Sequence, residues 1–256
     1  MKTRIITAFA ILAVIIPSLL FGGVLIDLLT AIIVAGCGYE YLKLCENKQP
    51  PLIMIATTIA SFAIIYLPIE YVLITIGLAI LVLFAIPVFY ERFTSKDAFV
   101  YVSFIIFIYC IASSFKLIYN ANPMFIWMII IATYACDTGA YFTGYFFGKH
   151  KLNERVSPKK TIEGSIGGFV IGAIASFTFA HFCISGFSTT ALAIACIIMP
   201  ITGQIGDLAF SAMKRNFNIK DFSNIFPGHG GMLDRLDSLI YNFIIFSFIY
   251  TVVIML

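Results

Sequence analysis

Long apolar runs separated by short polar stretches dominate the pattern of this chain. An apolar run of about 17–25 residues has the length needed to cross a bilayer as an α-helix. Nine such runs cover approximately residues 4–22, 24–43, 51–67, 70–90, 98–116, 122–138, 164–184, 189–210 and 239–256. The pattern therefore predicts an all-α, polytopic integral membrane protein with about nine transmembrane helices.

The composition supports this prediction. Hydrophobic residues make up 61% of the 256 residues and charged residues 11%, and the mean hydropathy is +1.02. Soluble domains average roughly 45–50% apolar and about 25% charged residues. The first run follows two basic residues, as in a secretory signal, but a small-x-small cleavage site is not evident and further spans follow, so we expect an uncleaved first helix. The six cysteines show no metal-binding spacing, and we expect buried, reduced thiols.

The distribution of charge predicts the orientation. With the N-terminus in the cytoplasm, fifteen of the sixteen lysines and arginines fall on the cytoplasmic side, Lys48 among them, and only Lys116 falls outside. The C-terminus is then outside, and two longer cytoplasmic loops, 139–163 and 211–238, carry the expected function. The net charge of +3 is too small to indicate a nucleic-acid partner.

Acidic residues near the ends of apolar runs need an explanation. Asp137 and Asp207 lie near the cytoplasmic ends of the sixth and eighth spans. A carboxylate at membrane depth costs about 2.5–3.5 kcal/mol and indicates a functional site or a buried partner; the alternative is an interfacial acid paired with a nearby cation. Asp234 and Asp237 are spaced i, i+3 and share one face if the ninth helix begins there. Alternatively, they are simple helix-start acids favoured by the helix dipole.

Basic residues and glycines surround these acids. Asp234 and Asp237 on one face, beside Asp207 at a similar depth, form an oxygen-rich cluster that suits a hard cation such as Mg²⁺. The nearby basic residues are Lys159, Lys160, Lys214, Arg215, Lys220 and Arg235. His229 and the glycine backbone beside it could approach an anion closely. Binding of anionic lipid would explain the lysines alone, but not the aspartates among them. The combination predicts phosphoryl or nucleotidyl transfer onto a lipid headgroup.

Small residues recur every fourth position after the SPKKT stretch, at Gly164, Gly168, Gly172 and Ser176. This spacing predicts a helix-packing face, either within the bundle or between protomers.

The stretch SAMKRNFNIKDFSNIFPGHGGMLDRLD, residues 211–237, resembles the signature of the phosphatidate cytidylyltransferases, or CDP-diacylglycerol synthases. The matching positions are Ser211, Lys214, Arg215, Lys220, Asp221, Ser223, Pro227, His229, Gly230, Gly231, Asp234, Arg235 and Asp237. The preceding QIGDLAFS and the earlier DTGAYFTGYFFGKHKL and SPKKTIEG are similar to the same family, so the resemblance covers about 137–238.

The resemblance implies that CTP and phosphatidate react to give CDP-diacylglycerol and pyrophosphate. It also implies that the reaction requires Mg²⁺, with K⁺ as a second ion in the metal site. It implies a homodimer in a membrane of the bacterial inner-membrane type. By motif position, Asp207, Asp234 and Asp237 are the implied metal and catalytic residues. From the chemistry of the reaction we also expect Lys214, Arg215 and His229 to be catalytic, by binding phosphate oxygens. The residues that we expect to bind substrate are Lys159, Lys160, Lys220, Arg235, Ser211, Gly230 and Gly231.

These expectations divide the chain into N-terminal scaffold helices, 1–136, and a C-terminal catalytic membrane region, 137–256. One alternative is a transporter or channel that uses Asp137 and Asp207 as ion ligands, but the internal repeat that would support it is not evident. Another is a CDP-alcohol phosphotransferase, whose D-G-x-x-A-R run the chain lacks.

Overall fold

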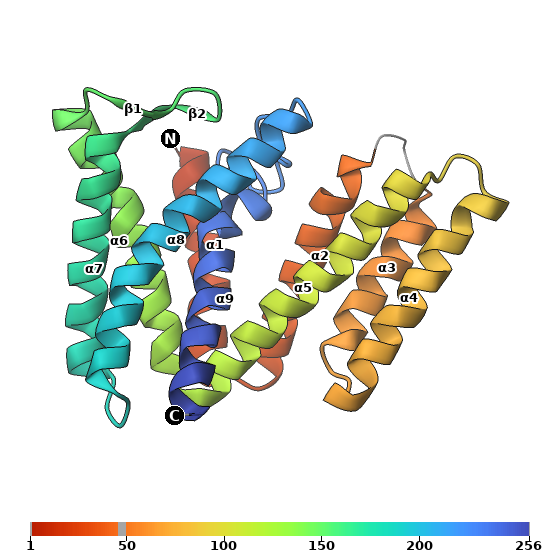
Figure 1. The fold of residues 1–256 in the computed structure, drawn as a ribbon, viewed down its shortest axis with the longest axis horizontal. Helices are drawn as coiled ribbons and strands as arrows, with labels where there is room; N and C mark the ends of the chain where they lie inside the picture. The colour runs from red at the N-terminus through yellow and green to blue at the C-terminus, as the bar shows by residue number, and fades with distance from the viewer. Residues whose placement is uncertain (1, 46–49, 256) are drawn as a thin grey trace. The chain divides into compact units, whose positions relative to one another are not determined.

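The computed structural model describes residues 2–45 and 50–255, with side chains from residue 6 onward. Lys48, one of the basic residues expected in the cytoplasm, lies outside the described residues. The α-helices in the described part of the chain are α1 Lys2–Phe21, α2 Val24–Tyr41, α3 Pro51–Ile64, α4 Ile69–Phe89, α5 Ser95–Ala121, α6 Pro123–Phe147, α7 Ile162–Cys183, α8 Thr189–Asn216 and α9 Leu233–Met255 (Figure 1). A 3₁₀ turn, Leu42–Leu44, follows α2, and a hairpin of β1 (Lys151–Asn153) and β2 (Ser157–Thr161) follows α6.

Each predicted apolar run is therefore helical, and the all-α polytopic prediction is confirmed. Seven helices in the described residues are long and apolar enough to cross a membrane. They are α2 with its 3₁₀ turn, α4, α5, α6, α7, α8 and α9. The apolar parts of α1 and α3 are shorter, at Ile6–Phe21 and Pro51–Ile64.

The two predicted loops are shorter than expected, because helices extend into both of them. The α6 helix continues to Phe147 and α8 to Asn216, so the connections are 148–161 and 217–232. The hydropathy criterion ended each run at the first charged or polar residues, whereas an amphipathic helix tolerates polar residues on one face. The β1–β2 hairpin inside the first connection was not predicted.

The chain forms two compact units that do not follow the order of the sequence. The first unit contains Met1–Ser113 together with Asp221–Asp234, and the second contains Ser114–Lys220 and Arg235–Leu256. Much of the signature between α8 and α9 thus belongs to the unit of the N-terminal helices. The predicted functional division at residue 136 stays a prediction.

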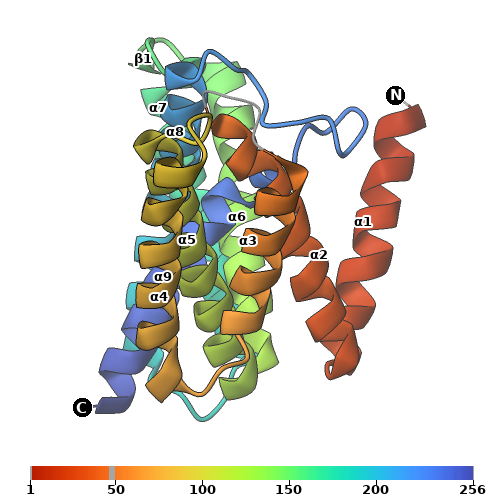
Figure 2. The same ribbon diagram turned by 90° about the vertical axis from the view of Figure 1, so that its right-hand side faces the viewer.

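In the first unit, a short segment from the C-terminal part of the sequence packs on the N-terminal helices. We call residues 221–232 the signature loop; Figure 2 shows it reaching toward α1. The hydroxyl of Thr7 on α1 donates to the carbonyl oxygen of Pro227 at 3.2 Å. A Cβ added at Gly36 on α2 would lie 3.0 Å from the Met232 side chain. The loop is therefore held by α1 and α2.

In the second unit, the ladder of small residues on α7 packs against α6. A Cβ at Gly168 would lie 2.6 Å from the Cys136 carbonyl oxygen, and one at Gly172 would lie 2.9 Å from that of Ala132. Only glycine permits so close an approach of two helix backbones. The prediction of a packing face is confirmed, and the partner is a helix of the same unit.

A buried amide ties three helices of the second unit together. Asn242 on α9 is fully buried, donates to the Thr133 hydroxyl on α6 at 2.8 Å and accepts from the Thr202 hydroxyl on α8 at 2.7 Å. A buried polar group with its partners satisfied fixes one relative placement of its helices. These two hydrogen bonds fix α6, α8 and α9 relative to one another close to Asp137, Asp207 and Asp237.

Candidate active site

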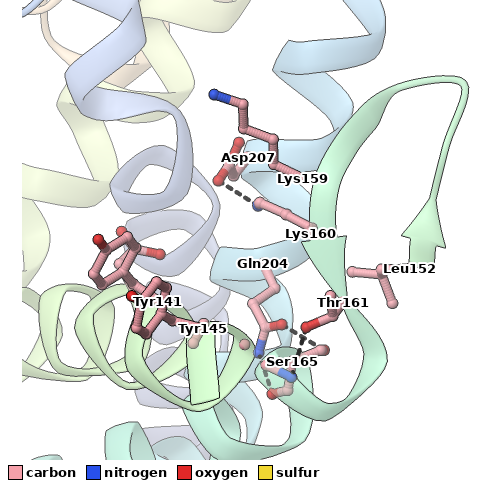
Figure 3. A pocket seen from close by; sticks show the side chains of 13 residues that line it. Tyr141, Tyr145, Leu152, Lys159, Lys160, Thr161, Ser165, Gln204 and Asp207 are labelled. Atoms are coloured by element: carbon pink, nitrogen blue, oxygen red, sulfur yellow. Dashed lines mark hydrogen bonds and ion pairs between the residues drawn. The ribbon is translucent and has the colours of Figure 1, made fainter. Parts of the chain in front are cut away.

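A cavity of about 520 Å³ lies in the second unit, where α6, the hairpin, α7 and α8 meet (Figure 3). Its lining combines two acids, two lysines, two tyrosines and several small or polar residues. The lining residues are Asp137, Ala140, Tyr141, Gly144, Tyr145, Leu152, Lys159, Lys160, Thr161, Gly164, Ser165, Gln204 and Asp207. Three of the residues that the sequence analysis predicted for the site, Lys159, Lys160 and Asp207, thus line one cavity.

The ion pair of Lys160 and Asp207 links the hairpin to α8. The Lys160 ammonium donates to Asp207 Oδ2, and the Ser211 hydroxyl donates to Asp207 Oδ1 at 3.3 Å. Antiparallel pairing of Lys151 with Thr161 closes the hairpin that carries Lys160. Both charged side chains remain about 30% exposed, so an anion or a cation can reach either of them from the cavity.

Gln204 and Ser165 form the neutral polar part of the lining. The Ser165 hydroxyl donates to Gln204 Oε1, and Gln204 Nε2 donates to the Ser165 carbonyl oxygen at 3.2 Å. Neither residue was predicted from the sequence. Gln204 had a usable signal, since an amide in an apolar run needs a buried partner just as Asp207 does.

A regular spacing on α6 also escaped the sequence analysis. Asp137, Tyr141 and Tyr145 are four residues apart and all line the cavity, as expected for one face of a helix. The two tyrosine rings stack with centroids 6.4 Å apart. The acid and the rings therefore form one continuous side of the cavity.

Three carboxylates of the second unit influence one another. Asp137 and Asp237 each interact electrostatically with Asp207, and Asp237 Oδ1 accepts from the Ser238 backbone N–H at 2.7 Å. The neighbouring cations are Lys160 and Arg235 for Asp137 and Lys214 for Asp237. The structure therefore brings Asp207 and Asp237 into one electrostatic group, and it adds Asp137.

These oxygen donors fit a magnesium ion that shares its ligands with a substrate. Among the described residues, no three His, Cys, Asp or Glu side chains converge tightly enough to hold an ion by themselves. Mg²⁺ commonly takes only one or two carboxylates and completes its shell with water and substrate phosphate. Asp207 and Asp237 can supply those carboxylates.

The other predicted basic residues have different surroundings. Lys214 is buried near the end of α8. Arg215 is exposed, and its guanidinium donates to the Ile219 carbonyl oxygen at 3.0 Å. Lys220 and Arg235 are also exposed. Their assignment to substrate phosphates stays a prediction.

Asp234 organises the signature loop in the first unit. Its Oδ2 accepts from the backbone N–H groups of Phe222 and Gly231, both at 2.9 Å. Gly230 donates to the Phe226 carbonyl oxygen at 3.1 Å and has a φ of +84°, which favours glycine. The N–H groups of Gly230 and Gly231 thus already donate to Phe226 and Asp234, and their predicted contact with substrate stays a prediction.

His229 has a buried ring nitrogen in the same loop. Its backbone N–H donates to the Phe226 carbonyl oxygen at 2.8 Å. In the part of the chain that the structure describes, its Nδ1 is buried without a hydrogen-bond partner. Such an atom is costly unless something binds it, which is consistent with a ligand contact at this residue.

An acid that the sequence analysis did not consider also contacts the signature loop. Glu40 on α2 is fully buried and accepts from the N–H groups of Met232 and Leu233, each at 2.7 Å. Its signal was similar to that of Asp207, a carboxylate inside an apolar run.

An apolar groove of about 360 Å³ borders the charged cavity. Its apolar lining comes from α7 and α8 and comprises Ile166, Phe169, Ile201, Ile205 and Leu208. Leu152, Ser165 and Gln204 line both the groove and the cavity. Fold and site together define a polytopic α-helical membrane protein with a charged cavity beside an apolar groove.

Comparison with known proteins gives the family. The model of the Cytidylyltransferase family matches residues 2–253, so the chain belongs to this family. The match includes the N-terminal helices, beyond the region that carries the sequence resemblance.

Curated relatives are similar over almost their whole length. The phosphatidate cytidylyltransferase of Staphylococcus haemolyticus (strain JCSC1435) is 32% identical over 254 residues, which cover 94% of this chain and 95% of the relative. The protein of the same name from Staphylococcus saprophyticus is 33% identical over 252 residues, with the same coverage. The one from Staphylococcus aureus (strain COL) is 32% identical over 257 residues, again with 94% and 95% covered.

Proposed function

We propose that this protein is a phosphatidate cytidylyltransferase, which transfers CMP from CTP to phosphatidate and releases pyrophosphate. The observation that carries the proposal is the charged cavity next to an apolar groove, in a member of the Cytidylyltransferase family. A lipid with a phosphate headgroup needs both environments at once. The names of the relatives agree with this substrate.

The two substrates would use different parts of this region. The phosphate of phosphatidate lies in the cavity near Lys160, while an acyl chain lies along Ile201 and Ile205 in the groove. The triphosphate of CTP enters from the aqueous end of the cavity, where Lys159 is exposed. Holding both in one orientation converts a bimolecular reaction into an effectively unimolecular step.

The reaction is a displacement at the α-phosphorus of CTP. An oxygen of the phosphatidate phosphate forms the new bond to this phosphorus, the bond to the β-phosphate oxygen breaks, and pyrophosphate leaves. A phosphate monoester has a second pKa of about 6, so its oxygen is largely anionic at neutral pH and needs no strong general base. The protein must instead neutralise and orient two anions that repel each other.

The basic residues serve this neutralisation. Lys160 and Lys159 face the cavity and bind substrate phosphates. Lys214, Arg215, Lys220 and Arg235 bind further phosphate oxygens, and His229 donates a hydrogen bond. Ser211, Gly230 and Gly231 complete the substrate contacts.

Asp207 and Asp237 would hold Mg²⁺, the family signature adds Asp234 to the residues proposed for metal binding, and K⁺ would be the second ion. Bound Mg²⁺ supplies positive charge that reduces the repulsion between the two substrates. Asp207 is paired with Lys160 in the structure, so the lysine keeps this carboxylate neutralised and in place before the substrates arrive.

The protein acts as a homodimer in a membrane of the bacterial inner-membrane type. The N-terminus, the hairpin and the signature loop face the cytoplasm, and the C-terminus faces outward. This orientation follows from the positive-inside distribution of lysine and arginine, and it gives the cavity access to cytoplasmic CTP.

The test is incorporation of labelled CTP into chloroform-extractable lipid by purified protein in mixed micelles with phosphatidate, Mg²⁺ and K⁺. Lipid-soluble product that requires phosphatidate and disappears with EDTA is expected. Lys160→Gln should lower kcat/KM more than tenfold, because a cavity cation is lost. Lys151→Gln removes an exposed cation of the same hairpin that does not line the cavity, and it should retain activity. No product from folded wild-type protein would refute the proposal, and ion flux would then be the next assay.

A further inference from the structure

Glu40 is a buried carboxylate in an apolar helix, and its partners all lie in or next to the signature loop. Oε1 accepts from the Met232 N–H at 2.7 Å and from the Ser223 hydroxyl. Oε2 accepts from the Leu233 N–H at 2.7 Å. Among the described residues no cation pairs with Glu40, so these three donors are what satisfies its charge. Hydrogen bonds to an ionised acceptor are about twice as strong as neutral ones.

These bonds lie at the start of α9. Leu233 is the first residue of α9, and the first N–H groups of a helix have no partner within it. A cap residue next to the helix usually satisfies them, but here the carboxylate comes from α2, almost two hundred residues earlier in the chain. A negative charge at this position also interacts favourably with the helix dipole.

Two glycines leave the space that the contact between Glu40 and the signature loop requires. A Cβ added at Gly231 would lie 2.4 Å from Glu40 Oε1, so any side chain at position 231 would displace the carboxylate. Gly36 lies one helical turn before Glu40 and leaves room for Met232. The close approach of Glu40 therefore explains why the second residue of the Gly-Gly pair, Gly231, is a glycine.

We propose that Glu40 is a positioning residue for the transfer reaction, which holds the signature loop and the start of α9 so that Asp234 keeps its functional orientation. The effect of Glu40 on catalysis rests on the proposed function, whereas its effect on the signature loop does not. Asp234 is held through the N–H groups of Phe222 and Gly231, and Gly231 directly precedes the residues that Glu40 binds. Loss of the Glu40 contacts would thus release the segment that orients Asp234.

The test compares Glu40→Gln with wild type by hydrogen–deuterium exchange and by kinetics. Glutamine keeps one acceptor oxygen but places an amide N–H₂ against the Leu233 N–H or the Met232 N–H, so at least one bond is lost. We expect amide exchange in peptides covering 225–236 to become at least tenfold faster. The concentration of Mg²⁺ that gives half-maximal activity should rise at least threefold. A lower amount of folded enzyme would not change that concentration.

The matched control is Asp97→Asn, which removes another buried carboxylate of the first unit, one that accepts from the N–H and hydroxyl of Thr94. It should leave loop exchange and Mg²⁺ dependence unchanged. If Glu40→Gln does not fold, Ser223→Ala and Gly231→Ala disturb the same contacts and should accelerate exchange in the same peptides.

Unchanged loop exchange in the folded Glu40 variant would overturn the inference, and so would faster exchange with wild-type Mg²⁺ dependence. Inactive wild-type protein would instead refute the proposed function. In that case the exchange comparison would still decide whether Glu40 holds the loop.

Discussion

At the scale of single residues, Asp234 has an observed role in holding the signature loop and a proposed role in binding Mg²⁺, and one substitution can separate the two. Both loop N–H groups donate to the same oxygen, Oδ2. In Asp234→Asn, the amide oxygen can take the place of Oδ2 and accept from both groups, so the loop geometry is retained. The charge proposed to bind Mg²⁺ is lost, and we expect a turnover at least a hundredfold lower with a melting temperature close to wild type. The labelled-CTP assay and thermal unfolding in detergent measure the two quantities.

Asp234→Ala is the matched variant, because it removes the charge and the acceptor together. Each buried N–H left without a partner costs about 1–3 kcal/mol, so this variant should be clearly less stable than Asp234→Asn. Near-normal turnover in Asp234→Asn would remove Asp234 from the metal site. An equal loss of stability in both variants would show that asparagine cannot replace the loop contacts.

The residues that could be predicted are those whose chemistry conflicts with an apolar surrounding. Asp207 and Lys160 were expected at the site, and the structure joins them in one ion pair. Tyr141 and Tyr145 could not be assigned from the sequence, because tyrosines near a helix end are also typical of the membrane interface. Only the packing of α6 beside the hairpin places them in the cavity.

At the scale of helices, the contact between α6 and α7 is limited by backbone distance. Gly168→Ala would place a methyl group 2.6 Å from the Cys136 carbonyl oxygen, so the helices must separate. Overpacking of this kind costs about 1–3 kcal/mol, and we expect a lower melting temperature in detergent. Activity should fall as well, since both helices line the cavity.

Gly77→Ala on α4 is the control for this prediction. A Cβ at Gly77 would have no heavy atom within 4 Å, and alanine has the higher helix propensity. Its melting temperature should stay at or slightly above that of wild type. A similar loss of stability in both variants would contradict the role of close packing at Gly168.

The helices were predictable from apolar runs, but their ends were not. A prediction from hydropathy ends a helix near its first charged residue, whereas α6 continues for ten residues beyond Asp137. The continuation is favoured because Asp137, Tyr141 and Tyr145 share the face that lines the cavity. The hairpin was missed because LNERVSPKKT combines polar residues and a proline, which is also typical of an irregular loop.

At the scale of the whole molecule, the grouping of distant segments was beyond the sequence. Residues 221–234 belong with the N-terminal helices through contacts such as that of Glu40 with Met232. The two residues are far apart in the sequence, so hydropathy and residue spacing cannot predict this contact. The N-terminal helices were expected to be a scaffold. They also supply the carboxylate that caps α9, so the signature depends on residues outside it.

The orientation in the membrane is a prediction that the ends of α7 can test. This helix has 22 residues and is about 33 Å long at about 1.5 Å per residue, close to the roughly 30 Å hydrocarbon thickness of a bilayer. Arg155 in the hairpin and Ser185 after α7 are both exposed. Cysteines introduced at these two positions should therefore lie on opposite sides of the membrane.

The measurement is labelling with a membrane-impermeant maleimide in intact cells and in inverted vesicles, after replacing the exposed Cys110 and Cys183 by serine. Burial raises the pKa of the Cys45 thiol to about 12, so this native cysteine stays protonated and reacts slowly at neutral pH. Arg155→Cys should label only in inverted vesicles and Ser185→Cys only in intact cells, because basic residues favour the cytoplasmic side. The reverse pattern would turn the cavity away from cytoplasmic CTP, and the proposed nucleotide would then have no route to the site.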